Sequence, residues 1–290
     1  MKPAPFIHLA PTSLKDALAL LNEHAPDARV LAGGQSLVPL MNFRLSRPSH
    51  LIDLNRIPDL SYIRQNGDHL SIGAMTRERT IENSELVRTH LPLLHEATSY
   101  IGHLPIRSRG TIGGSIVNAD PAAEYPAALL ALDGEMVLHS TRGKRHVPAA
   151  SFFEGVLSTV LEPDELLAEL IVPKTAPGTG SAFLEISRRH GDFALVGIAA
   201  QVTLSGETIT NVQLAACGVG PGPVRLSNAE HKVLEAGLTE LSVKLAARTA
   251  ADEVNPLSDI HASADYRRRL TAVLTQRSLM KAHERSQGNP

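Results

Sequence analysis

Two glycine doublets, each preceded by a small or apolar residue, constrain this chain more than any other feature. The first, Gly33-Gly34, follows ARVLA, and the second, Gly113-Gly114, lies within TIGGSIV. Glycine adopts positive φ and permits the close approach of another group, and successive amides in such a turn bind anions. The first doublet leads into a helix-like start, SLVPLM, where a helix N-terminus also favours negative charge. Two such loops predict a grip on a diphosphate from opposite sides, with bare amides from both.

The residues around the second doublet add polar groups suited to a nucleotide. Thr111, Ser115 and Asn118 offer hydroxyl and amide donors, while Asp120 and Glu124 are suited to accept hydrogen bonds from sugar or ribityl hydroxyls. The alternative for Asp120-Pro121 is a simple turn start. Neither loop fits G-x-G-x-x-G or G-x-x-x-x-G-K-S/T, so the motifs favour neither a dinucleotide Rossmann turn nor an NTPase phosphate loop.

Periodicity and turn residues predict a mixture of short strands and helices. PTSLKDALALL is expected to be helical, with Ser13 as N-cap and Asp16 three residues later. Asn66-Gly67 predicts a type I′ turn in a hairpin over residues 61–74. The other expected strands are residues 28–32, 50–55, 135–150 (a hairpin turning at TRGK), 165–173, 181–189, 194–209 and 211–220. The other expected helices are residues 80–102 and three stretches that begin near Asn228, Thr239 and Tyr266.

Length and local composition predict the domain organisation. A chain of 290 residues suggests about two domains. Residues 173–180, PKTAPGTG, hold two prolines and two glycines and have the composition of a boundary. Beyond it, strands precede helices, which is the order of an α+β module.

Composition and charge exclude several classes of protein. The net charge of −2 favours neither nucleic acid nor an anionic membrane as partner, and no apolar run reaches the ~20 residues of a membrane span. The N-terminus has no apolar core of a signal peptide, which makes the cytoplasm the default location. Cys217 is the only cysteine, and the 13 histidines show no ligand spacing, so no metal or cluster site is expected in this chain. Arg267-Arg268-Arg269 is interpreted as a solvated helix face.

Longer motifs resemble a known family. VLAGGQSLVPLMNFRLSRPSHLIDLNRIPDLSYI and RGTIGGSIVNADPAAEYPAALLALDGE resemble the FAD-binding medium subunit of molybdenum hydroxylases, a family that includes carbon monoxide dehydrogenases and xanthine dehydrogenase relatives. EISRRHGDFALVGIAA and CGVGPGPVRLSNAE resemble the C-terminal domain of that subunit. The match runs in the family's order over about residues 5–285.

The resemblance implies a fold and a division of the chain. It implies an α+β protein with a two-subdomain FAD-binding domain of the PCMH type. The subdomains are expected at about 1–57 and 58–175. A C-terminal domain of a three-stranded antiparallel sheet and a helical bundle is expected over 176–290.

The resemblance also implies positions for the FAD site. The first pyrophosphate loop would comprise Val30, Leu31, Ala32, Gly33, Gly34, Gln35, Ser36 and Leu37. The second would run from Thr111 through Gly113 and Gly114 to Ser115, with Asn118, Asp120 and Glu124 beside the cofactor. Ile101 and Leu167 are expected to line the cofactor with apolar contacts, and Phe193 to lie against the isoalloxazine ring. For Phe193 a core strand aromatic is the alternative.

Three positions depart from relatives. Gln35 stands where carbon monoxide dehydrogenases carry His, and Ser115 stands where some relatives have Asp. Leu184 stands where xanthine dehydrogenases place a Lys near the cofactor. These departures leave substrate and acceptor open. A hydroxybenzoyl-CoA reductase subunit, which carries an inserted four-cysteine cluster, is disfavoured because this chain has only Cys217.

The implied function is electron transfer within a larger enzyme. A large partner would carry molybdopterin and a small partner would carry 2Fe-2S clusters, in a dimer of heterotrimers. This chain would take electrons from the clusters and pass them through FAD to an external acceptor, with no catalytic or metal-binding residue of its own. Two alternatives stay open: a free-standing FAD-dependent oxidase or dehydrogenase of related fold, and a non-catalytic nucleotide-binding protein. The organic substrate, the acceptor and the stability of the chain without its partners are not determined by the sequence.

Overall fold

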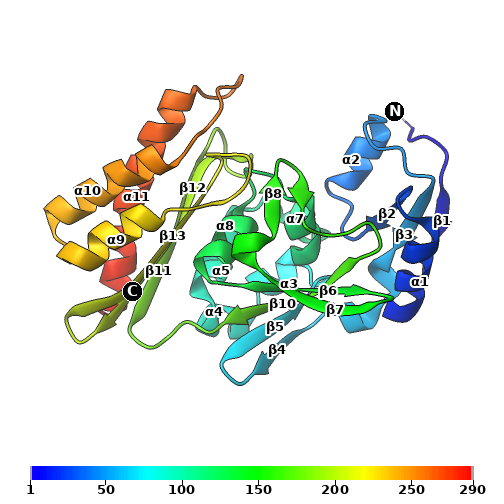
Figure 1. Ribbon diagram of the computed structural model, residues 1–290, viewed down its shortest axis with the longest axis horizontal. Coiled ribbons are helices and arrows are strands. Elements are labelled where there is room, and N and C mark those ends of the chain that lie inside the picture. Colours follow the sequence, from blue (N-terminus) through cyan, green and yellow to red (C-terminus); the bar gives the residue numbers. More distant parts are fainter. Residues whose placement is uncertain (1, 289–290) are drawn as a thin grey trace.

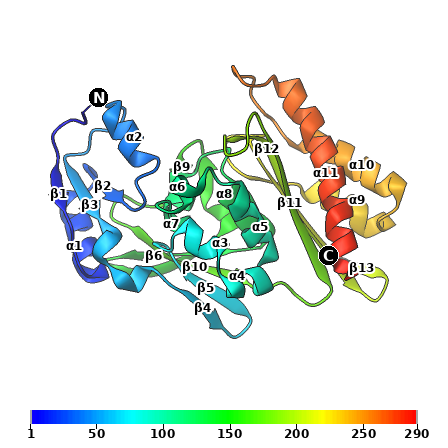
Figure 2. The same cartoon turned by 180° about the vertical axis from the view of Figure 1, so that it is seen from behind.

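The computed structural model describes residues 2–288, which form three larger sheets arranged along the long axis of the molecule and one two-stranded sheet. The N-terminal sheet lies at one end and the C-terminal sheet lies toward the other, with helices α9–α11 outermost (Figure 1). A five-stranded sheet and its helices lie between them, as the reverse view also shows (Figure 2).

The N-terminal sheet is parallel, with strand order β1-β3-β2. Its strands are β1 (Ile7–Leu9), β2 (Ala28–Leu31) and β3 (His50–Asp53). Two helices and two 3₁₀ turns accompany it: α1 (Leu14–His24), α2 (Leu37–Asn42), η1 (Leu54–Arg56) and η2 (Pro58–Leu60). The predicted cap of α1 is confirmed, because the Ser13 side chain accepts a hydrogen bond from the Asp16 amide at 3.1 Å.

The middle sheet is antiparallel, with order β4-β5-β10-β6-β7. Its strands are β4 (Ile63–Asn66), β5 (His69–Gly73), β6 (Glu135–Ser140), β7 (Gly143–Pro148) and β10 (Leu166–Pro173). The helices between β5 and β6 are α3 (Glu78–Glu82), α4 (Glu85–His90), α5 (Pro92–Tyr100), α6 (Leu104–Arg107), α7 (Ile112–Asn118) and α8 (Glu124–Ala131). After β7 come η3 (Ala149–Ser151) and the short pair β8 (Phe153–Gly155) and β9 (Ser158–Thr159).

The first hairpin of this sheet turns one residue later than the sequence predicts. Asn66 pairs with His69, so the turn residues are Gly67 and Asp68, and Gly67 takes the positive φ of 57°. Asn66 instead remains in the strand, where its side chain donates to Ser71 Oγ at 2.9 Å. The predicted Asn66-Gly67 turn is therefore wrong by one position.

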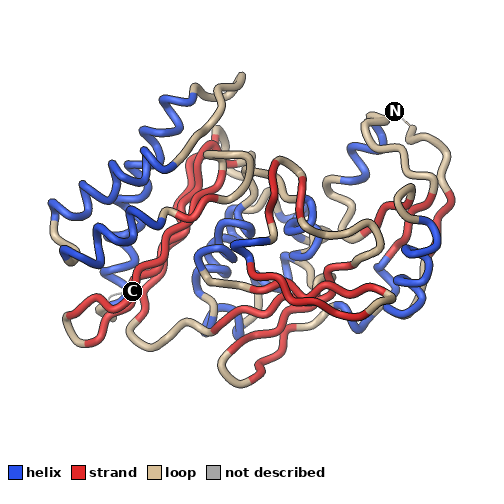
Figure 3. The backbone as a smooth tube through the Cα atoms, in the orientation of Figure 1, coloured by secondary structure: helices blue, strands red, loops and turns tan. Residues whose placement is uncertain are grey.

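The C-terminal part is an antiparallel sheet covered by three helices. Three long strands and a two-residue fourth follow one another in the sheet: β11 (Thr179–Ser187), β12 (Ala194–Ser205), β13 (Thr208–Cys217) and β14 (Val224–Arg225). The helices are α9 (Ser227–Ala236), α10 (Glu240–Glu253) and α11 (Ala264–Ser286). The tube view shows these helices on one face of the sheet (Figure 3). The arrangement confirms the predicted α+β class.

Residue alternation divides the C-terminal sheet between two cores. Ala182 and Ile198 belong to the core under α9–α11, whereas Phe183, Ala199 and Cys217 belong to the core of the middle sheet. Successive strand residues point to opposite faces, so one face of β11–β13 packs on α5 and α8.

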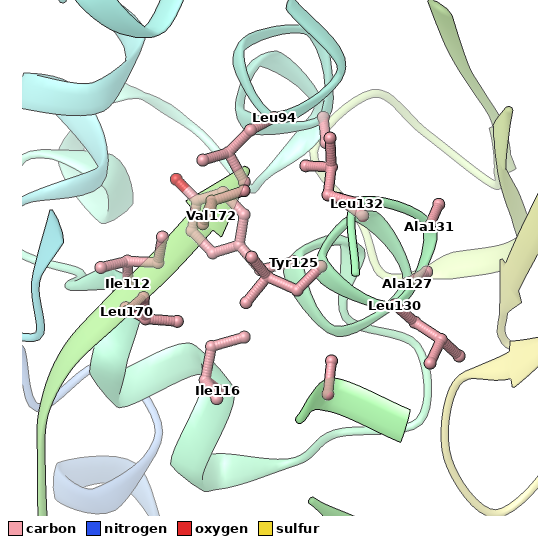
Figure 4. Close-up of a cluster of buried hydrophobic side chains, with 14 of the residues drawn as sticks. Leu94, Ile112, Ile116, Tyr125, Ala127, Leu130, Ala131, Leu132, Leu170 and Val172 are labelled. Atoms are coloured by element: carbon pink, nitrogen blue, oxygen red, sulfur yellow. The ribbon is translucent and has the colours of Figure 1, made fainter. Parts of the chain in front are cut away.

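Helix α8 lies between the two sheets, and all eight of its residues are buried. A helix that is apolar on every side is stable only when it is enclosed. Tyr125 lies at the centre of this core, near Leu94, Ile112 and Ile116 (Figure 4). Its hydroxyl is 3.1 Å from Thr98 Oγ1, which satisfies a polar group in an apolar interior. Among residues 2–288, none of the helices has the length and apolar character needed to cross a membrane.

Candidate functional site

The structure brings the two glycine loops into contact. A Cβ atom on Gly33 would lie 2.4 Å from the carbonyl oxygen of Arg109 and 2.8 Å from the Cα of Gly110. A Cβ atom on Gly114 would lie 3.6 Å from the Cβ of Ala32. The loop after β2 and the loop before α7 therefore meet backbone against backbone, although they are far apart in the sequence.

The first loop presents unused backbone donors. Within the described residues, the amides of residues 33–37 have no hydrogen-bond acceptor from the protein. Gly34 has φ 74°, a value that glycine adopts without strain. The Gln35 side chain donates to the carbonyl of Gly33 at 3.1 Å, so it engages a carbonyl oxygen and none of the backbone amides of residues 33–37. A run of free amides that leads into α2 is suited to bind an anion.

The second loop uses its amides within the protein. Ile112 and Gly113 donate to the carbonyls of Thr76 and Ala74 at 3.1 and 2.9 Å. Gly114 donates to the Thr111 side chain at 3.2 Å, and Ser115 donates to the Thr111 carbonyl at 3.0 Å. The expectation that both doublets expose bare amides is therefore wrong for the second loop. Its glycines are part of α7, whose first turn is held by the segment that follows β5.

Close packing explains the second doublet instead. A Cβ atom on Gly113 would lie 2.5 Å from the Cβ of Ala74 and 2.7 Å from its carbonyl oxygen. Thr111 is 2% exposed and is the N-cap of α7. These contacts hold α7 against the segment that follows β5.

Asn55 and Arg77 connect the two loops, and no motif in the sequence indicates either residue. Asn55 Nδ2 donates to the carbonyl of Ala32 at 2.9 Å. The Arg77 guanidinium donates both to Asn55 Oδ1 and to the carbonyl of Arg109. Burial, and then the charge of Arg109, lower the pKa of Arg77. Each of these polar residues follows closely after a strand, β3 or β5, which is the only signal that the sequence offers for them.

These features fit a diphosphate. Five adjacent free amides supply directed donors, Arg77 and Arg109 supply positive charge, and the glycine contacts exclude side chains from the junction of the loops. Hydrogen bonds to charged groups are stronger than neutral ones. The donor set therefore matches the pyrophosphate of FAD.

The acidic residues beside the second loop differ in environment. Asp120 Oδ1 accepts from the Ala122 amide at 2.9 Å, so this carboxylate does start a turn before α8. Glu124 is the first residue of α8 and is 6% exposed. Burial, with smaller effects from Glu78 and Asp120, raises the pKa of Glu124 to about 8. Glu124 is therefore mostly protonated at neutral pH.

The predicted apolar contacts lie in different settings. Phe193 is 69% exposed and precedes β12, so the alternative of a core strand aromatic is wrong. Ile101 and Leu167 are buried in the core of the middle sheet, at the end of α5 and in β10. Of the remaining predicted residues, Val30 and Leu31 end β2, Leu37 begins α2, and Asn118 ends α7. Among these four, only Leu37 takes part through one of the free amides.

Two family models match the chain. One describes the FAD-binding domain in molybdopterin dehydrogenase and matches residues 4–175. The other describes the C-terminal domain of the carbon monoxide dehydrogenase flavoprotein and matches residues 181–282.

Individual relatives match over almost the whole length. The 6-hydroxypseudooxynicotine dehydrogenase complex subunit alpha of Paenarthrobacter nicotinovorans is 40% identical over 99% of this chain and 97% of its own. The carbon monoxide dehydrogenase medium chain of Hydrogenophaga pseudoflava is 39% identical over 98% of this chain and 99% of its own. A solved structure of carbon monoxide dehydrogenase from the latter organism superimposes with a TM-score of 0.96 over 98% of this chain and 99% of that chain, at 40% identity.

Proposed function

The chain belongs to the family of FAD-binding medium subunits of molybdenum hydroxylases, which are oxidoreductases, and from this premise we propose that it relays electrons. In this proposal electrons arrive from 2Fe-2S clusters of a partner subunit and leave to an external acceptor. FAD supplies this chemistry when bound, because it accepts electrons singly and releases them in pairs. The protein holds the cofactor, sets its electrostatic surroundings and excludes side reactions.

We assign the binding roles as follows. The free amides of residues 33–37 hold the pyrophosphate, with Arg77 and Arg109 adding positive charge. Ser115, Asn118, Asp120 and Glu124 lie on the cofactor's polar side, and Phe193 contacts the ring. The free amides are the observation that carries the proposal, because they place anion-binding donors inside the region that matches the FAD-domain model.

We further propose that the chain works between a large molybdopterin-binding subunit and a small iron–sulfur subunit, as a dimer of heterotrimers. Two observations support this. Relatives are named as subunits or medium chains of dehydrogenases, and Cys217, the only cysteine, is buried, so this chain cannot hold a four-cysteine cluster.

Reconstitution tests the proposal. The full chain, purified and incubated with FAD, should become yellow at about one flavin per chain and should not be reduced by organic substrates on its own. Addition of the large and small subunits should make flavin reduction depend on the substrate of the complex. A chain that binds no FAD, or that oxidises an organic substrate alone, would contradict the proposal.

A further inference from the structure

Arg267 of α11 lies outside the proposed FAD contacts, yet it is a buried cation. Its side chain is 6% exposed, whereas Arg269, two residues later on the same helix, is exposed. The Nε atom of Arg267 is inaccessible to solvent and has no hydrogen-bond partner within the described residues. Burial of a charge costs free energy unless the charge is paired and hydrogen-bonded. The remaining contacts of this guanidinium therefore have to offset that cost.

The guanidinium of Arg267 joins the beginning of β12 to the end of β13. Its Nη1 atom donates to the carbonyl of Leu195 at 2.6 Å and to the carbonyl of Gly218 at 3.1 Å. Its Nη2 atom donates to Asp259 Oδ2 at 2.7 Å, which supplies the opposite charge. Leu195 is the second residue of β12, and Gly218 directly follows β13. One side chain thus holds two strand ends and the loop between α10 and α11.

Gly218 extends this set of contacts into the other matched part of the chain. Its amide donates to the carbonyl of Pro121 at 2.7 Å. Gly218 has φ 75°, and a Cβ atom there would lie 2.5 Å from the carbonyl oxygen of Leu195. Pro121 lies in the part that matches the FAD-domain model, and Gly218 lies in the part that matches the C-terminal model. The hydrogen bonds therefore run from α11, through the end of β13, to the segment that precedes α8.

Both segments that Arg267 joins carry proposed cofactor contacts. Leu195 follows Phe193 by two residues, and Asp120 directly precedes Pro121. We propose that Arg267 is a positioning residue of the flavin site: through the two carbonyl groups that it holds, it fixes the segment of Phe193 relative to the segment of Asp120. This inference rests on the proposed FAD-binding function.

The shape of the guanidinium, and not its charge alone, suits this role. Arginine presents its donors in a rigid planar fork, whereas the lysine ammonium is a compact charge on a flexible stem. Arg267 uses that fork for three acceptors, two carbonyl oxygens and one carboxylate. Arg267→Lys keeps the positive charge but cannot reproduce all three directions, so this variant separates the geometry from the charge.

The experiment uses the full chain reconstituted with FAD. It measures the Kd for FAD by fluorescence titration, and the visible circular dichroism of the saturated protein, which reports the surroundings of the ring. Arg267→Lys should weaken FAD binding by about tenfold, the equivalent of one charge-assisted hydrogen bond, and should change the dichroism. Arg269→Met, on the exposed side of the same helix, is the matched control and should follow the wild type in both measurements.

A double-mutant cycle tests whether Arg267 acts through the start of β12. Side chains that act through one another have non-additive effects, so Arg267→Lys should change the dichroism less in a Phe193→Ala background than in the wild type. Additive effects would overturn the positioning role. A lower melting temperature in Arg267→Lys, with Kd and dichroism equal to those of the wild type, would also overturn it, because the residue would then only stabilise the fold.

A milder variant covers the case in which Arg267→Lys does not fold. Asp259→Asn removes only the carboxylate that pairs with the guanidinium, at a side chain that is 45% exposed. It should change the Kd and the dichroism in the same direction by a smaller amount, and unchanged values would overturn the proposal. A wild-type chain that binds no flavin would instead overturn the proposed function, which absorbance reveals before any variant is compared.

Discussion

The first glycine loop, residues 32–37, leaves five consecutive amides without a protein acceptor in the described structure, whereas the second loop, residues 110–115, donates its amides at 112–115 to the protein. The first ends a parallel strand and opens a short helix. The second is already helical and is held by the carbonyls of Ala74 and Thr76. Two similar sequences thus make different contacts, and in our proposal the first loop binds the anion while the second positions the first.

Gly33→Val is expected to have the largest effect, because it breaks the contact on which both tasks depend. The new side chain would meet the backbone of Arg109 and Gly110, which cannot move aside as a flexible side chain can. We expect a loss of about 3 kcal/mol or more in the free energy of unfolding and no bound FAD. Denaturant unfolding and flavin content per folded chain measure the two effects. Gly155→Val is the control, since nothing lies within 4 Å of a Cβ there.

Gly34→Val tests the first loop alone. Its φ of 74° is unfavourable for valine, at a cost of about 1–3 kcal/mol of stability. Displacing the anion from two or three amides should cost about 4 kcal/mol of binding, or roughly a thousandfold in Kd for FAD. Gly67→Val carries a similar backbone strain at φ 57° in an open turn and should keep its flavin. Full flavin retention in Gly34→Val would remove the anion-binding role from the first loop.

The sequence predicts much of the secondary structure, but it does not predict that the two loops use their backbone amides differently. Capping and periodicity place α1 and α10 within a residue or two, because Ser13 and Thr239 bond to amides three residues ahead. The hydrogen-bond partner of an amide in a folded chain is often far away in the sequence: Gly113 donates to Ala74, and no pattern around the doublet indicates this.

Arg267 is a second case in which distant contacts decide the environment of a residue. The run of three arginines predicts a solvated side chain, yet Arg267 is buried and donates to the carbonyls of Leu195 and Gly218. The domain boundary at 175/176 and the roles of Ile101 and Leu167 stay predictions.

Arg77→Met asks how much the connection between the loops contributes. The guanidinium holds the Arg109 carbonyl and Asn55, and Asn55 in turn holds Ala32. Loss of about 1.5–2 kcal/mol of charge-assisted bonding should weaken FAD binding by roughly ten- to thirtyfold. Fluorescence titration of FAD measures the change. Arg79→Met is the matched control, because Arg79 lies on α3 and only pairs with Glu82 three residues away. Equal affinities for the two variants would show that Arg77 is dispensable to the loops.

Thr111→Val should have the smallest effect on binding and discriminates most directly between the loops. Valine keeps the shape of threonine but cannot accept the Gly114 amide, so α7 loses its N-cap bond. Loss of such a cap costs typically about 1 kcal/mol of stability, which thermal unfolding can resolve. If the second loop only positions the first, the Kd for FAD should change by less than about threefold, because 1.4 kcal/mol is needed for a tenfold change. Thr111→Ser, which retains the hydroxyl, should recover the stability.

The contradicting outcome is that Thr111→Val stays folded but loses flavin as severely as Gly34→Val. In that case the Thr111 hydroxyl, or the amides of the second loop, contact the diphosphate themselves. The two loops would then share one task, as the sequence alone predicts.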